Sequence, residues 1–133
     1  MNVPSDLTHT TEHEWVRVEG DVGTVGVTDY AQDQLGDIVY LDLPAAGASV
    51  EQYAKMGEIE SVKAVSDLFS PVSGEIVEVN QEAVDSPELV NSDAYGRGWL
   101  IKVRLANLDE MDGLLSAEAY DEHITRLMEE GTD

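Results

Sequence analysis

The chain has 133 residues, 42% of them hydrophobic, so we expect one domain over residues 1–133 that buries a single modest core. Its 28 acidic residues against 7 basic ones give a formal net charge of −21, which excludes nucleic acid and anionic membranes as partners because both would be repelled. The sequence has no cysteine, which excludes disulfides, thiolate metal sites and a cysteine nucleophile.

Alternating hydrophobic and polar side chains, the period of an extended strand, recur along the chain. The predicted strands are residues 14–18, 21–28, 37–43, 48–53, 74–80 and 99–105. A turn at Gly20 makes the first two strands an N-terminal β-hairpin. Residues 28–34 follow as a short helix that Thr28 caps and Gly36 ends. We expect the polar residues 1–8 to be loose.

Residues 57–70 alternate in the same way but are too long for one strand. Turn-forming residues punctuate both ends and no glycine lies inside, so we expect two short strands joined by a type I turn at residues 61–64. Lys63 would then stand at the tip of a hairpin, with Glu60 and Asp67 on its two arms. The chain has only three lysines, although a lysine on an exposed turn is usually a plain solubility residue.

The C-terminal part predicts loops and one longer helix. Residues 86–91 indicate a loop with one helical turn, and residues 91–98 are a connection rich in turns. Ser116 can cap a final helix. The apolar side chains that would share one face of this helix are Tyr120, Ile124, Leu127 and Met128. We expect this helix to cover one end of a β core.

Two segments on either side of the predicted Lys63 hairpin are alike. Residues 36–41 (GDIVYL) match residues 74–79 (GEIVEV) in residue type at every position except the fifth. Two similar β units that each leave one face uncovered can pack together into a common core. The sequence therefore predicts a mainly β fold with small helices, a flattened barrel or sandwich with an N-terminal hairpin and a C-terminal helix.

The chain is poor in patterns that support catalysis. Residues 9–13 read His-Thr-Thr-Glu-His, as in some zinc peptidases, but that chemistry needs both imidazoles on one face of a helix. Two β-branched threonines and the strand that follows disfavour a helix here, so a solvated lead-in is the simpler interpretation. We find no calcium loop, no phosphate loop after a strand and no serine–histidine–aspartate arrangement. We expect no catalytic residue and no metal site.

A small β domain without catalytic groups that offers one lysine at a hairpin tip has the form of a carrier. Acylation of the Lys63 amine would remove its charge and leave a long flexible arm. Tethering a cargo in this way raises its effective concentration at a partner's site. Because the chain has no cysteine, any sulfur chemistry would come from the group on the arm.

The segment Glu60-Ser61-Val62-Lys63-Ala64 matches, together with several others, a known family in order and spacing over about residues 7–129. The other matching segments are residues 13–16, 26–32, 35–39, 70–76 and 98–103. The chain resembles the H protein of the glycine cleavage system, a lipoyl carrier. The resemblance implies a single lipoyl-carrier domain with a hybrid barrel-sandwich fold. It also implies lipoate on Lys63 as a swinging arm.

The resemblance also implies partners. A pyridoxal-phosphate glycine decarboxylase would load an aminomethyl group onto the oxidised arm. A tetrahydrofolate-dependent aminomethyltransferase would unload it with release of ammonia, and a flavin-containing dihydrolipoamide dehydrogenase would reoxidise the dithiol. A lipoate-attaching enzyme would modify Lys63, and the chain itself would be a non-catalytic carrier subunit.

Two acidic positions match the arm-contacting residues of that family, in which the loaded arm folds into a surface cleft that shields the aminomethyl group from water. These positions are Glu14 and Asp67. An ammonium head could gain a charge-assisted hydrogen bond from either carboxylate, about 1.5–3 kcal/mol if well placed. The alternative for each residue is a solvated acid, since the chain has 28 acidic residues.

Other functions stay open at this point. A biotinyl carrier shares the fold and the tip lysine, although a biotin-carrying lysine usually lies between methionines, whereas Val62 and Ala64 flank Lys63 here. A lipoyl-transfer intermediate that passes its arm to other carriers is compatible with the same residues. An enzyme would turn over in isolation, and a purely structural protein would tolerate Lys63→Arg.

The acidic residues are spread along the whole chain. The regular apolar pattern disfavours disorder, and of the two remaining interpretations we favour a salt-rich cytosol, where screening removes self-repulsion, over a docking surface for a basic partner. The sequence has no run of 18 apolar residues and no basic start followed by an apolar block. We therefore expect a cytoplasmic protein without a membrane span or signal peptide.

Overall fold

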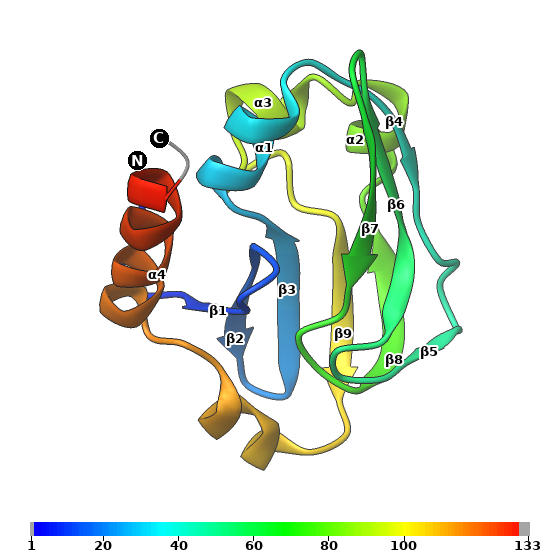
Figure 1. The fold of residues 1–133 in the computed structure, drawn as a ribbon. Coiled ribbons are helices and arrows are strands. Elements are labelled where there is room, and N and C mark those ends of the chain that lie inside the picture. The colour runs from blue at the N-terminus through cyan, green and yellow to red at the C-terminus, as the bar shows by residue number, and fades with distance from the viewer. Residues whose placement is uncertain (1, 131–133) are drawn as a thin grey trace.

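Two antiparallel β-sheets form the body of the protein in the computed structural model, which describes residues 2–130 (Figure 1). The six-stranded sheet has the order β1 (Thr8–His9), β2 (Glu14–Glu19), β3 (Val22–Val27), β9 (Ile101–Leu105), β8 (Gly74–Val79) and β5 (Ser49–Val50). The three-stranded sheet has the order β4 (Ile38–Asp42), β6 (Lys55–Ser61) and β7 (Val65–Phe69). Within residues 2–130 neither sheet closes on itself, so the fold is the expected sandwich-like arrangement rather than a closed barrel.

Helices lie in the connections between some of the strands and after the last strand, β9. They are α1 (Asp29–Leu35), α2 (Gln81–Asp85), α3 (Leu89–Ser92), a 3₁₀ segment η1 (Leu108–Gly113) and α4 (Ala117–Glu130). The Thr28 hydroxyl accepts a hydrogen bond from the Ala31 amide at 3.2 Å, which confirms the predicted cap of α1. Gly36 ends that helix with φ of 81°, a conformation that glycine adopts without a steric penalty. None of the described helices is long and apolar enough to cross a membrane.

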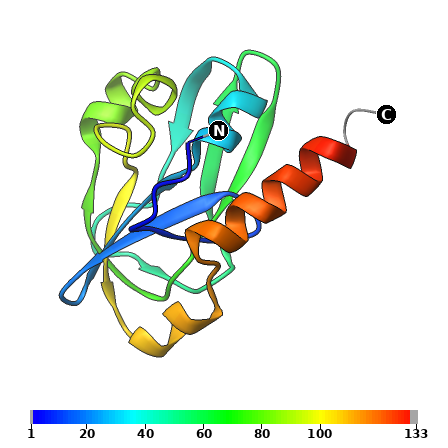
Figure 2. The ribbon, with the colours of Figure 1, turned by 90° about the vertical axis from the view of Figure 1, so that its left-hand side faces the viewer.

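The core lies between the two sheets, and its most buried side chains come from both. Members with at most 3% exposure include Val16, Val25, Ile38, Leu41, Ile59, Leu68, Ile76, Ile101 and Val103. Helix α4 lies against β1 on the outside of this β core (Figure 2). Its residues Tyr120 and Ile124 are fully buried, as predicted, whereas Met128 is 39% exposed and lies beyond the contact.

The repeated segments form β4 and β8, one strand in each sheet. The pairing register shifts between Ile38 and Tyr40 in β4, and at the equivalent place between Ile76 and Glu78 in β8. The two isoleucines point into the common core with 3% and 1% exposure. The internal similarity therefore extends to a shift in the pairing register at the same position, which supports the interpretation of two related β units around one core.

Two local predictions were wrong, and one helix was missed. Residues 1–8 were expected to be loose. Residue 1 lies outside the described residues, but Leu7 is only 2% exposed and the next two residues pair with β2. Residues 48–53 contain only the two-residue strand β5. Helix α2 was missed, since its five residues are too few to show a helical period.

Candidate functional site

Lys63 lies at the exposed tip of the hairpin formed by β6 and β7, as predicted. The last paired residues are Glu60 and Val65, and residues 62–64 form the tip. The Ser61 amide donates to the Ala64 carbonyl at 2.8 Å. A type I turn is commonly closed by the fourth amide bonding to the first carbonyl, but here the Ala64 amide donates to the Ser61 hydroxyl at 3.1 Å. A serine side chain thus organises the turn, as serine does in many turns.

The hairpin tip also contacts residues 36–37, which form the corner between α1 and β4. The Val62 amide donates a hydrogen bond of 3.0 Å to the Asp37 carbonyl. Lys63 Cε lies 3.7 Å from the point that a β-carbon on Gly36 would occupy, so the aliphatic part of the lysine runs beside this glycine. The hairpin tip is therefore held from one side by the chain at Gly36 and Asp37.

The three lysines differ in how their amines are engaged. Lys55 Nζ lies 2.9 Å from Glu58 Oε2 and 3.2 Å from Asp67 Oδ1. Lys102 Nζ lies 3.7 Å from Glu78 Oε1 and also over the Trp99 ring. Within residues 2–130, Lys63 forms no ion pair. Its amine is exposed and uncommitted, which leaves it accessible to a modifying enzyme.

A cavity of about 300 Å³ opens beside the outer edge of β7. Its lining residues are Thr10, Thr11, Glu12, Glu14, Tyr53 and Phe69. Glu14, at the start of β2, is only 1% exposed. Its Oε1 accepts a hydrogen bond from the Thr10 hydroxyl at 2.6 Å, and its Oε2 accepts one from the Phe69 amide at 3.3 Å.

Burial raises the pKa of Glu14 to about 8, from an ordinary value of 4.5. The hydrogen bonds from Thr10 and Phe69 act in the opposite direction, while the nearby charge of Glu12 adds to the increase. Glu14 is therefore mostly a neutral acid at pH 7. A cation that enters the cavity would favour the charged form and displace the proton.

Asp67 lies on β7 two residues before Phe69, so alternation places both side chains on the same face of the strand. It is half exposed, is paired with Lys55 and does not line the cavity. The structure thus brings Glu14 to the backbone of β7, whereas it commits Asp67 to an ion pair on the surface of the hairpin.

The His-Thr-Thr-Glu-His segment does not form a helix. His9 belongs to β1, and His13 has φ of 76°. The His9 ring stacks on Tyr120 with 4.5 Å between ring centroids, and His13 Nδ1 lies 2.9 Å from the Tyr120 hydroxyl. These histidines pack α4 onto the N-terminal strands, which is a structural role.

Sequence reasoning missed several residues around the site. Thr10, Tyr53 and Phe69 line the cavity, but they are far apart in the chain and follow no shared pattern. Ser61 was expected at the start of the turn at residues 61–64 and in the family motif, but its side chain was given no role. A serine at the first position of a turn is a recognised signal for the side-chain bonds seen here.

Comparisons with known proteins agree on one family. The model of the glycine cleavage H-protein family matches residues 7–127. The glycine cleavage system H protein of Burkholderia ambifaria is 59% identical over 120 residues, which are 90% of this chain and 94% of that protein. The H protein of Symbiobacterium thermophilum is 55% identical over 120 residues, again 90% of this chain and 94% of that protein.

A solved structure has the same fold. The crystal structure of a glycine cleavage system H protein from Mycobacterium marinum matches with a TM-score of 0.86 and 41% sequence identity. The match covers 92% of this chain and 99% of that chain. The similarity therefore extends over the full architecture described above and not only over the hairpin.

Proposed function

The chain belongs to the glycine cleavage H-protein family and is a lipoyl carrier of glycine cleavage, and we propose that Lys63 is its lipoylated residue. The observation that carries this proposal is the state of the three lysine amines. Lys55 and Lys102 are held by carboxylates, whereas Lys63 stands at an exposed tip without an ion pair among the described residues.

The residues at the tip suit the attachment of a carboxylic acid. Lipoylation joins Lys63 Nζ to the lipoate carboxyl group as an amide, which removes the positive charge of the amine. Removal of that charge breaks no ion pair of Lys63 within the described residues, so we expect modification to cost little stability. When attached, the lipoyl group supplies a disulfide that can accept an aminomethyl group on one sulfur while the other becomes a thiol.

The cavity at Glu14 is the proposed resting place of the aminomethyl group. It is small, partly enclosed and lined by two carboxyl groups, those of Glu12 and Glu14. A cationic ammonium would gain charge-assisted hydrogen bonds there, and enclosure would keep water from the carbon between nitrogen and sulfur. Asp67 would join this contact only if the ammonium displaces Lys55 from it.

Membership of the glycine cleavage system implies multienzyme partners. The partners that we propose are a pyridoxal-phosphate glycine decarboxylase, a tetrahydrofolate-dependent aminomethyltransferase, a flavin-containing dihydrolipoamide dehydrogenase and a lipoate-attaching enzyme. The chain would visit them in turn as a single cytoplasmic carrier domain without turnover of its own.

The test is the mass of the protein after incubation with a purified lipoate–protein ligase, lipoic acid and ATP. We expect the wild type to gain one lipoyl group on the peptide that contains Lys63, and Lys63→Arg to gain none. Lys55→Arg is the matched control, because it removes a different exposed lysine, and it should be modified like the wild type. A lipoyl group on another residue, or biotin in place of lipoate in the native protein, would contradict the proposal.

A further inference from the structure

Asn91 in α3 uses both ends of its amide to hold the corner between α1 and β4. Its Oδ1 accepts a hydrogen bond of 2.9 Å from the Ile38 amide. Its Nδ2 donates to the Gly36 carbonyl at 2.9 Å and to Gln32 Oε1 at 2.9 Å. One side chain thus grips the backbone immediately before and immediately after Asp37.

This corner would not be rigid by itself. Gly36 is the residue with the greatest backbone freedom, and its φ of 81° lies outside the range that most residues favour. The side chain of Asp37 is exposed, so it is not held in place by burial in the core. Asn91 therefore supplies hydrogen bonds that fix the direction of the Asp37 carbonyl.

The Asp37 carbonyl in turn fixes the hairpin tip. Lys63 and Ala64 form hydrogen bonds with Ser61, which belongs to the same turn. In the part of the chain that the structure describes, the bond from the Val62 amide to Asp37 is the one hydrogen bond that joins residues 62–64 to another element. The tip depends on Asn91 through two steps, from Asn91 to the corner and from the corner to Val62.

We propose that Asn91 is a positioning residue for the modification of Lys63, an inference that rests on the proposed lipoylation of that residue. A modifying enzyme must bring Lys63 Nζ into line with an activated carboxyl group, and misplacement of a reacting group lowers the rate steeply. Without Asn91 the tip would hold its competent conformation for a smaller fraction of the time. The apparent affinity of the enzyme for the carrier is its affinity for the competent conformation multiplied by that fraction.

The experiment measures initial rates of lipoylation against carrier concentration, with a purified lipoate–protein ligase, lipoic acid, ATP and the full unmodified chain. For Asn91→Ala we expect KM for the carrier to rise about fivefold to tenfold, the factor that corresponds to roughly one net hydrogen bond. We expect kcat to stay within about twofold, because the chemical step uses the same amine once the tip is bound.

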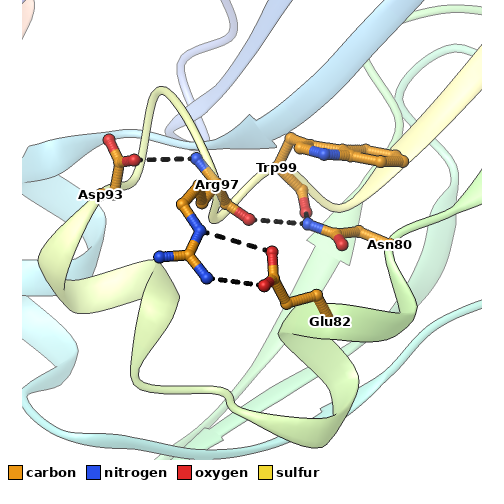
Figure 3. A network of polar contacts seen from close by, with 5 residues as sticks. All are labelled: Asn80, Glu82, Asp93, Arg97 and Trp99. Atoms are coloured by element: carbon orange, nitrogen blue, oxygen red, sulfur yellow. Dashed lines mark hydrogen bonds and ion pairs between the residues drawn. The ribbon is translucent and has the colours of Figure 1, made fainter.

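Asn80 supplies the matched control. It is another asparagine whose amide holds backbone, and its Nδ2 donates to the carbonyls of Arg97 and Trp99, both at 2.7 Å (Figure 3). Its amide group bonds to the loop before β9 and not to the corner at Gly36. Asn80→Ala should lower the melting temperature but leave KM at the wild-type value.

The hydrogen-exchange rate of the Val62 amide is a second measurement. General destabilisation would speed exchange at many amides and not at Val62 in particular. We expect faster exchange at Val62 in Asn91→Ala and the wild-type rate in Asn80→Ala. Should Asn91→Ala fail to fold, Asn91→Asp keeps the acceptor for Ile38 and loses both donors, and the same rise in KM is expected.

Wild-type KM and wild-type Val62 exchange in both Asn91 variants would overturn the inference while Lys63 lipoylation stands. Equal effects of the Asn80 and Asn91 variants would also overturn it, because the role of Asn91 would then be general stability. A wild type that is not lipoylated at Lys63 would overturn the proposed function and this inference with it.

Discussion

Glu14 on β2 accepts a hydrogen bond of 3.3 Å from the amide of Phe69 on β7, although 55 residues separate them in the chain. The bond joins the six-stranded sheet to the free edge of the three-stranded sheet. It also places a buried carboxyl group beside the hairpin that presents Lys63. The protonation state of that group affects both the stability of the protein and the cavity it lines.

We expect Glu14 to make the protein less stable as the pH rises. Burial raises the pKa of Glu14 to about 8 in the folded protein, against 4.5 ordinarily, so the folded state binds this proton more tightly than the unfolded state. The stabilisation is complete below pH 4.5 and is lost as the pH rises to about 8. The free energy of unfolding of Glu14→Gln, measured with urea at several pH values, should lack this decline. A constant difference between wild type and variant over that range would contradict the expectation.

The histidines around Tyr120 act in the opposite direction. Burial lowers the pKa of His9 to about 4 and that of His13 to about 4, from 6.5. The unfolded chain takes up these protons first, so stability is complete above pH 6.5 and falls between 6.5 and about 4. His13→Gln should lose less stability than the wild type on acidification across this window. Identical pH dependence of the two melting temperatures would show that His13 does not contribute.

The cavity residue Glu14 should protect the loaded arm. Glu14→Ala should release the aminomethyl group without enzyme roughly 10 to 160 times faster than the wild type, the factor for one lost charge-assisted hydrogen bond of about 1.5–3 kcal/mol. The measurement is the rate of ammonia release from the loaded carrier. Glu118→Ala removes an acid at the start of α4 and is the control, for which we expect the wild-type rate. Unchanged release from Glu14→Ala would remove Glu14 from this role.

Asp67 should help to retain the aminomethyl group only when its ion pair with Lys55 is broken. Lys55→Met frees the Asp67 carboxylate, which is otherwise 3.2 Å from Lys55 Nζ. If Asp67 contacts the ammonium, this variant should retain the aminomethyl group longer than the wild type, whereas Asp67→Asn should retain it for a shorter time. The same ammonia-release assay checks both. Opposite changes in the two variants are required, and equal rates would assign Asp67 to the surface ion pair alone.

Salt should stabilise the fold. A net charge of −21 creates self-repulsion, which salt screens. The distance over which charges repel each other, the Debye length, is about 10 Å at 0.1 M salt but only about 3 Å at 1 M. We expect the melting temperature to fall when potassium chloride is reduced from molar to millimolar concentration. Sodium chloride at equal ionic strength should act equally, since screening does not depend on the cation. A melting temperature independent of salt would contradict adaptation to a salt-rich cytosol.

Much of the architecture followed from local patterns. Alternation predicted the Lys63 hairpin, the side chain of Thr28 predicted the start of α1, and the repeat predicted two related β units around one core. Such features depend on neighbours within a few residues, and these contacts form in much the same way wherever the segment lies in the fold. The carrier interpretation also rests on a local feature, because the position of a lysine at a turn depends only on the residues around it.

The environment of the site depended on contacts between distant segments. The sequence identified Glu14 as an acid at a family position, but only its burial in the folded protein makes it mostly a neutral acid at pH 7. Asn91 lies 53 residues from Ile38, and no local pattern connects them. Hydrogen bonds of this kind arise only when packing brings the segments together, since folding excludes the water that would otherwise satisfy the same polar groups.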